Sequence, residues 1–149
     1  MRKLKAWITR TLSAAEADPA AREQARNLAM ASLLVEVLRA DYETSEAERR
    51  QVMESLRNML GLGEDACAEL LADAEQQVDR AHDLHQFTAE VNRALAPEEK
   101  LRLVEQMWRV ARSDATVHKY EEHIIRRVSD LLHVSHREFI AAKLRAAET

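Results

Sequence analysis

Apolar residues recur along this chain every three or four positions, the spacing that places side chains on one face of an α helix. The clearest such stripe combines Leu101, Val104, Met107, Trp108 and Ala111. No stretch of useful length alternates apolar and polar residues as a strand would. The chain has only 2 Gly and 2 Pro and is rich in Ala, Leu, Glu and Arg, which also favours helices. The pattern predicts an all-α protein.

Start and stop signals divide the pattern into seven or eight helices. The signals are capping residues, prolines suited to a first turn and one glycine break: Asp18-Pro19, Ser45, Gly61-Leu62-Gly63, Asp83, Pro97 and Ser135. Ser45 with Glu48, and Ser135 with Glu138, have the spacing of a capping box. A chain of 149 residues is long enough to bury a core, and we expect residues 1–149 to form one domain.

The first 15 residues favour a short basic amphipathic helix. Four bases precede the first acid, Glu16, and Trp7 lies among the apolar residues. Such a helix either packs on the domain through Trp7 or contacts an anionic membrane surface. Packing on the domain is the preferred interpretation, because amphipathicity alone does not separate the two cases.

A short acidic pattern occurs twice, 73 positions apart. Residues 40–48 (the first corner) read ADYETSEAE, and residues 113–121 (the second corner) read SDATVHKYE. In each corner, an Asp lies at the end of one apolar stripe, and a Glu lies at the start of the next. Long-period repetition of this kind predicts two pseudo-symmetric halves, over about residues 25–80 and 84–147.

The halves resemble the tellurite-resistance TerB-like family, whose repeats carry an Ala-Asp-Gly corner and a Glu that opens the next helix. The second half is the closer match, in VARSDATVHKYEEHIIRRVSDLLHV. Tyr42 and Ala115 stand where the family usually has Gly. The resemblance implies a role in metal-ion or oxyanion stress and calcium binding by the acidic residues.

Two interpretations of the corners stay open. In the first, a hard divalent cation, calcium before any other, binds to Asp41, Glu48, Asp114 and Glu121, with Glu43 and His118 as further ligands. In the second, the carboxylates only cap helices and pair with nearby bases. The positions of the two aspartates need an explanation more than those of the glutamates, because the aspartates follow helix C-termini, where the helix dipole disfavours an anion, and a cation is one such explanation.

Composition and the absence of known motifs argue against several classes of function. A net charge of −4 argues against a nucleic-acid partner, which calls for a basic face. The single Cys67 excludes an intramolecular disulfide, and no apolar run approaches the roughly 20 residues of a membrane span. No phosphate loop, nucleophile elbow or Ser/His/Asp arrangement indicates an enzyme. The six His, all in the second half, are typical of solvated surface residues.

We therefore expect a non-enzymatic cytoplasmic stress-response module that binds a divalent cation at the corners and docks on a protein partner. The resemblance points to a membrane-associated complex as that partner, which would place the chain peripheral to the inner membrane. The alternative is a metal-free interaction scaffold or a co-chaperone-associated regulatory domain. A hydrolase using paired carboxylates ranks last, and the sequence leaves the oligomeric state open.

Overall fold

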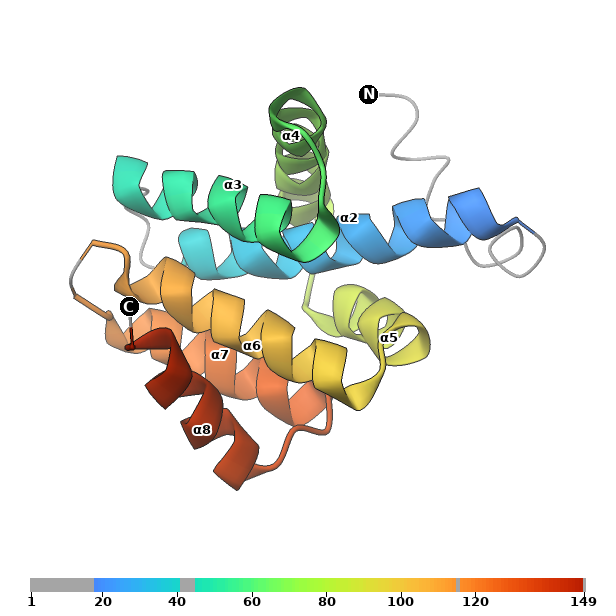
Figure 1. The fold of residues 1–149 in the computed structure, drawn as a ribbon. Coiled ribbons are helices and arrows are strands. Elements are labelled where there is room, and N and C mark those ends of the chain that lie inside the picture. The colour runs from blue at the N-terminus through green and yellow to red at the C-terminus, as the bar shows by residue number, and fades with distance from the viewer. Residues whose placement is uncertain (1–17, 41–44, 115, 149) are drawn as a thin grey trace.

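The computed structural model describes residues 18–40, 45–114 and 116–148, and within these ranges the chain forms α helices and no strand (Figure 1). The all-α prediction is confirmed. The expected basic helix at residues 1–15 lies outside the described residues. The described part contains seven helices: α2 (Pro19–Leu38), α3 (Glu46–Leu60), α4 (Glu64–Arg80), α5 (His85–Ala94), α6 (Pro97–Arg112), α7 (Lys119–Leu131) and α8 (His136–Ala146).

The helices begin and end where the capping residues predict. Asp18 accepts a hydrogen bond from the N–H of Ala20, and Ser45 and Ser135 precede α3 and α8 as their N-caps. Gly61 ends α3 in the left-handed conformation, with φ of 67°, which glycine adopts without a Cβ penalty. These local signals fix the boundaries because each satisfies N–H or C=O groups that a helix end leaves without a partner.

Helix α2 lies at the centre of the fold. It packs against five other helices, α3 to α7, and every residue from 27 to 35 is buried. A helix that is buried all round belongs in a core. Figure 1 shows α2 running across the molecule, with α3 and α4 on one side and α5, α6, α7 and α8 on the other.

Helix α6 is the second hub. It packs against α2, α3, α7 and α8, and its Trp108 is fully buried with its ring 5.4 Å from that of Phe139 of α8. Helix α2 thus packs against the two helices that follow it, α3 and α4, and helix α6 likewise packs against the two that follow it, α7 and α8. Whether a pseudo-twofold axis relates the halves stays a prediction.

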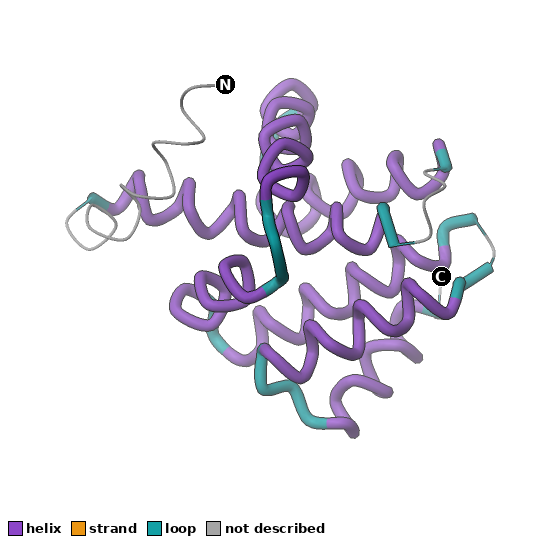
Figure 2. Tube along the Cα trace, turned by 180° about the vertical axis from the view of Figure 1, so that it is seen from behind, coloured by secondary structure: helices purple, strands orange, loops and turns teal. Residues whose placement is uncertain are grey.

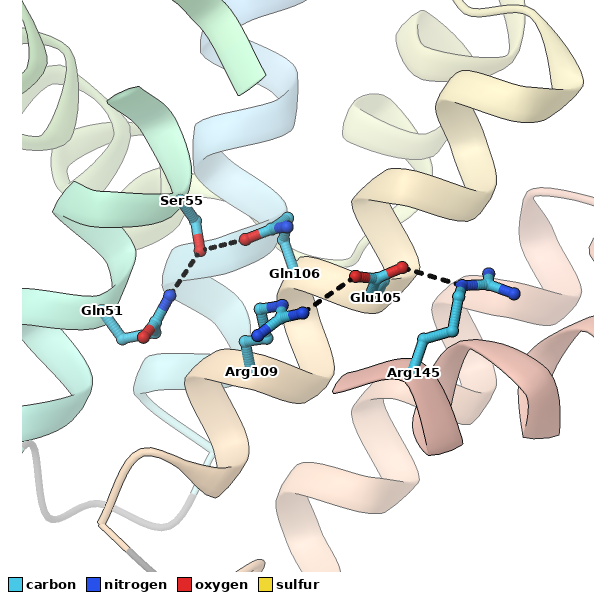
Figure 3. A network of polar contacts seen from close by, with 6 residues as sticks. All are labelled: Gln51, Ser55, Glu105, Gln106, Arg109 and Arg145. Carbon is cyan, nitrogen blue, oxygen red and sulfur yellow. Dashed lines mark hydrogen bonds and ion pairs between the residues drawn. The ribbon is translucent and has the colours of Figure 1, made fainter. Parts of the chain in front are cut away.

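A polar network joins α3, α6 and α8 across this core (Figure 3). Fully buried Ser55 donates to Gln106 (2.7 Å) and accepts from Gln51 (3.1 Å). Glu105, which directly precedes Gln106 in α6, accepts a hydrogen bond from Arg145 of α8 at 2.9 Å and another from an arginine of its own helix. Because buried polar groups must be paired, these bonds fix the register of the three helices.

Candidate functional site

The helix ends that flank the two acidic corners lie at the same end of the molecule. Helices α2 and α6 end there, and α3 and α7 begin there, on the left of Figure 1 and, seen from behind, on the right of Figure 2. Helix α3 also packs against α6, so the two corners belong to neighbouring elements. Asp41 and Glu43 of the first corner lie outside the described residues.

Glu48 is the third residue of α3 and is fully buried. Its backbone N–H donates to Oγ of Ser45 at 3.0 Å, so the side chain of the N-cap holds the first turn. This confirms one of the two bonds of the predicted capping box. Val52 and Leu56, on the same face of α3, are also fully buried, so the carboxylate lies on the helix face that turns to the core.

Glu121 holds the equivalent position in α7 and is likewise fully buried. Its Oε1 accepts a hydrogen bond of 3.0 Å from the backbone N–H of His118, the N-cap residue. The side chain of His118 is half-buried. In the second corner the side chain of the glutamate therefore caps the start of the helix.

Asp114 is only half-buried, in the turn after α6. Its Oδ1 accepts from the N–H of Thr116 at 3.3 Å, the local turn bond that aspartate often makes. Asp114 thus has a local hydrogen bond, whereas the glutamate of the same corner is the fully buried acid, and cation binding by either residue stays a prediction. The dipole argument considered the helix ends alone, whereas tertiary packing buries Glu121 and leaves Asp114 partly in water.

A glutamate can cap a helix without being fully buried as Glu48 and Glu121 are. Helices α6 and α8 also carry a glutamate at their third position, and both side chains cap: Glu99 accepts from the N–H of Ala96 at 2.8 Å, and Glu138 from that of Ser135 at 3.1 Å. Glu99 is nonetheless exposed and Glu138 half-buried. Complete burial thus separates Glu48 and Glu121 from the other two.

The described donors do not complete a metal site among themselves. In the parts of the chain that the structure describes, no three side chains of His, Cys, Asp or Glu are placed to hold one ion. Calcium takes six to eight oxygens and fills many of these places with backbone carbonyls and water. The oxygen-rich set of the corners fits that preference, although the described carboxylates alone would be too few.

A hollow elsewhere on the surface was not predicted. It measures about 420 Å³ and lies between α2, α7 and the connection from α4 to α5, with His82 and His123 in its wall. These histidines are 41 positions apart, and their spacing gives no local signal. Cys67, in contrast, is fully buried as predicted, and burial raises the pKa of its thiol.

Comparison with known families gives one match. The model of the family described as tellurite resistance protein TerB matches residues 27–144, a range that includes both corners and most of every described helix. No curated protein and no solved structure matches the chain. Among the described residues, no helix combines the length and the apolar character needed to cross a membrane.

Proposed function

The chain belongs to the tellurite resistance protein TerB family, whose model covers most of its length, and from that premise we propose that it is a non-enzymatic stress-response module that binds a divalent cation. The cation site combines the two corners. Asp41, Glu43 and Glu48 supply oxygens from the first, and Asp114, Glu121 and His118 supply donors from the second. Calcium is the leading candidate, because oxygen donors predominate.

The complete burial of Glu48 and Glu121 carries this proposal. An ionised carboxylate is costly to bury unless it is paired, hydrogen-bonded or bound to a metal. The glutamates of α6 and α8 cap their helices without that cost, so capping does not account for the difference. Glu121 already accepts a hydrogen bond from the N–H of His118, and a cation bound between the corners would offset the remaining cost of the two buried charges where the fold excludes water.

Docking on a protein partner is the second part of the proposal. It is supported by Tyr120, which is 57% exposed although it is large and partly apolar, and which directly precedes Glu121. Tyrosine is enriched at protein interfaces, where its ring and hydroxyl both find contacts. A partner that covers Tyr120 would sense the state of the second corner. We further propose a cytoplasmic location and a membrane-associated complex as the partner, and membership of the family supports this part of the proposal.

The alternative is a metal-free interaction scaffold, or a regulatory domain associated with a co-chaperone. The bond from His118 to Glu121 and the bond from Thr116 to Asp114 favour it, because each gives a carboxylate a role in the local backbone. The two candidates differ in one measurable respect: a protein that binds an ion is stabilised by that ion, whereas a scaffold is not.

The test compares buried and exposed glutamates in matched variants. The full chain is stripped of metal, and its melting temperature is followed during titration with calcium, magnesium or zinc. The first variant is Glu48→Gln with Glu121→Gln, and its control is Glu99→Gln with Glu138→Gln. Glutamine keeps the capping acceptor and removes the charge, so both variants retain their helix starts.

We expect calcium to raise the melting temperature of the unmodified chain and of the control, and to leave the buried-site variant unchanged. At a hundred times its dissociation constant, an ion adds about 2.7 kcal/mol, or roughly 5–10 °C for a chain of this size. Equal shifts in both variants, or no shift with any ion, would support the scaffold. If the buried-site variant fails to fold, Asp41→Asn with Asp114→Asn answers the same question.

A further inference from the structure

The hollow noted above is open to solvent and lined by both polar residues (its wall) and apolar residues (its floor), and none of them belongs to the corners. Val78, Ala81, Leu84 and Ile124 supply apolar surface. The other lining residues are Glu36 of α2, His82 and Asp83 of the connection from α4 to α5, and His123 and Arg127 of α7. A volume of about 420 Å³ is in the range of sites for small organic ligands.

The cationic groups of the wall are available to a ligand. Arg127 and both histidines are exposed, and none makes a hydrogen bond or ion pair with the residues that the structure describes. The two acidic residues of the wall, in contrast, interact with their surroundings in the protein. Asp83 accepts a bond of 2.8 Å from the N–H of His85, at the start of α5. Glu36 is half-buried, and burial raises the pKa of its carboxyl, while nearby Arg39 lowers it.

The net charge of the wall depends on whether its two imidazoles are neutral or protonated. With both imidazoles neutral, one guanidinium faces two carboxylates, and the net charge is minus one. With both imidazoles protonated, three positive groups face the same two carboxylates. Arg39 and Asp79, on the adjoining parts of α2 and α4, pair with each other and add no net charge. Histidine in general gains its proton between about pH 8 and pH 5.

We infer that this hollow binds a small organic anion, with an oxyanion head on Arg127, His82 and His123 and an apolar body on the floor, more tightly as the pH falls. The guanidinium and imidazolium groups donate only, and they match carboxylate, sulfonate or phosphate oxygens. A metal ion is a poorer fit, because no group of three metal-ligating side chains occurs in the described residues. This site is independent of the proposed cation site.

The probe is benzenesulfonate, whose charge stays fixed over the pH range, so that any pH dependence belongs to the protein. Binding to the full chain is measured from the shifts of the backbone amide signals of α7 in NMR titrations at about pH 5.5 and about pH 7.5, a readout that variants of the histidines retain. Methanesulfonate tests the head alone, and benzyl alcohol tests the body alone. Arg127→Gln is compared with Arg102→Gln, which changes an exposed arginine on another helix.

We expect saturable binding that is at least about tenfold tighter at the lower pH, because the wall gains two positive charges there. Arg127→Gln should weaken binding about tenfold or more, whereas Arg102→Gln should leave it unchanged. The double variant His82→Gln with His123→Gln should lose most of this pH dependence and keep only the part that comes from the carboxyl of Glu36, whose pKa burial raises. Absence of saturable shifts, equal binding by Arg127→Gln, or binding of benzyl alcohol as tight as that of benzenesulfonate overturns the proposal.

Discussion

Four helices of this protein carry a glutamate at their third position, and the four divide into two groups. In α6 and α8, Glu99 is exposed and Glu138 half-buried, and each accepts the N–H of its N-cap residue. In α3 and α7, Glu48 and Glu121 are fully buried. The first group shows what capping alone asks of a glutamate, namely a hydrogen bond at the surface.

The second group also takes part in capping its helices. In α3 the hydroxyl of Ser45 accepts from Glu48, whereas in α7 Glu121 accepts from His118. A capping bond is thus described at both helix starts, and the burial of the glutamate is the same at both. Glu99 and Glu138 also cap their helices and are less buried, so capping alone does not account for that burial. Both fully buried glutamates belong to an acidic corner, and the cation proposal follows from that.

Charge reversal should separate the two groups most strongly. We expect Glu121→Lys to lower the free energy of unfolding by at least about 3 kcal/mol, because it places an opposite charge in a fully buried site. Glu99→Lys should cost about 1 kcal/mol, through the lost cap and an unfavourable charge near the helix N-terminus. Urea unfolding followed by circular dichroism of metal-free protein measures both. Equal losses would mean that the burial of Glu121 has no energetic consequence.

Removal of a capping hydroxyl should have a smaller and more uniform effect. Ser45 and Ser135 accept the N–H of the third helix residue at 3.0 and 3.2 Å, so Ser45→Ala and Ser135→Ala should each cost about 1 kcal/mol. The same urea experiment measures this. Repeating it with saturating calcium sharpens the comparison. If Ser45 is also a cation ligand, only Ser45→Ala reduces the stabilisation by calcium, and a reduction in both variants would contradict that role.

Features encoded within a few residues were predicted well from the sequence. Asp18-Pro19, Ser45, Gly61 and Ser135 each mark a helix boundary in the structure, because capping satisfies groups close in the chain. The apolar stripes likewise predicted the all-α fold and four of the six buried positions of α6, although Leu101 of the predicted stripe is only half-buried. One-residue differences at helix ends, such as the end of α2 at Leu38, are within the fraying of a last turn.

Features that depend on packing between distant segments were not predicted. Periodicity assigned Asp114 and Glu121 to inward faces, yet only the contacts of α7 with α6 and α2 decide that Glu121 is fully buried and Asp114 half-buried. The hollow unites Glu36 with His82 and His123 from three separate segments. No spacing rule relates such residues, since the relative placement of helices comes from side-chain packing along their whole length.

Glu36 is a half-buried acid, intermediate between the exposed and the fully buried glutamates, and we expect its replacement to have the smallest effect on stability. Burial raises the pKa of its carboxyl, so the folded chain binds this proton more tightly than the unfolded chain does. The resulting stabilisation is complete at acid pH and is lost as the pH rises through the folded-state pKa. Glu36→Gln should therefore match the original chain near pH 4 and be slightly more stable near neutral pH, by a few tenths of a kcal/mol.

The matched control is Glu23→Gln, which changes an exposed acid on the same helix and should leave the pH dependence of stability unaltered. Urea unfolding at several pH values between about 4 and 7.5 measures the difference. A larger gain for Glu36→Gln at acid pH than at neutral pH would reverse the sign and refute the argument. A gain confined to neutral pH would place Glu36 between the exposed and the buried glutamates, and the cost of charge would then rise with burial across the whole molecule.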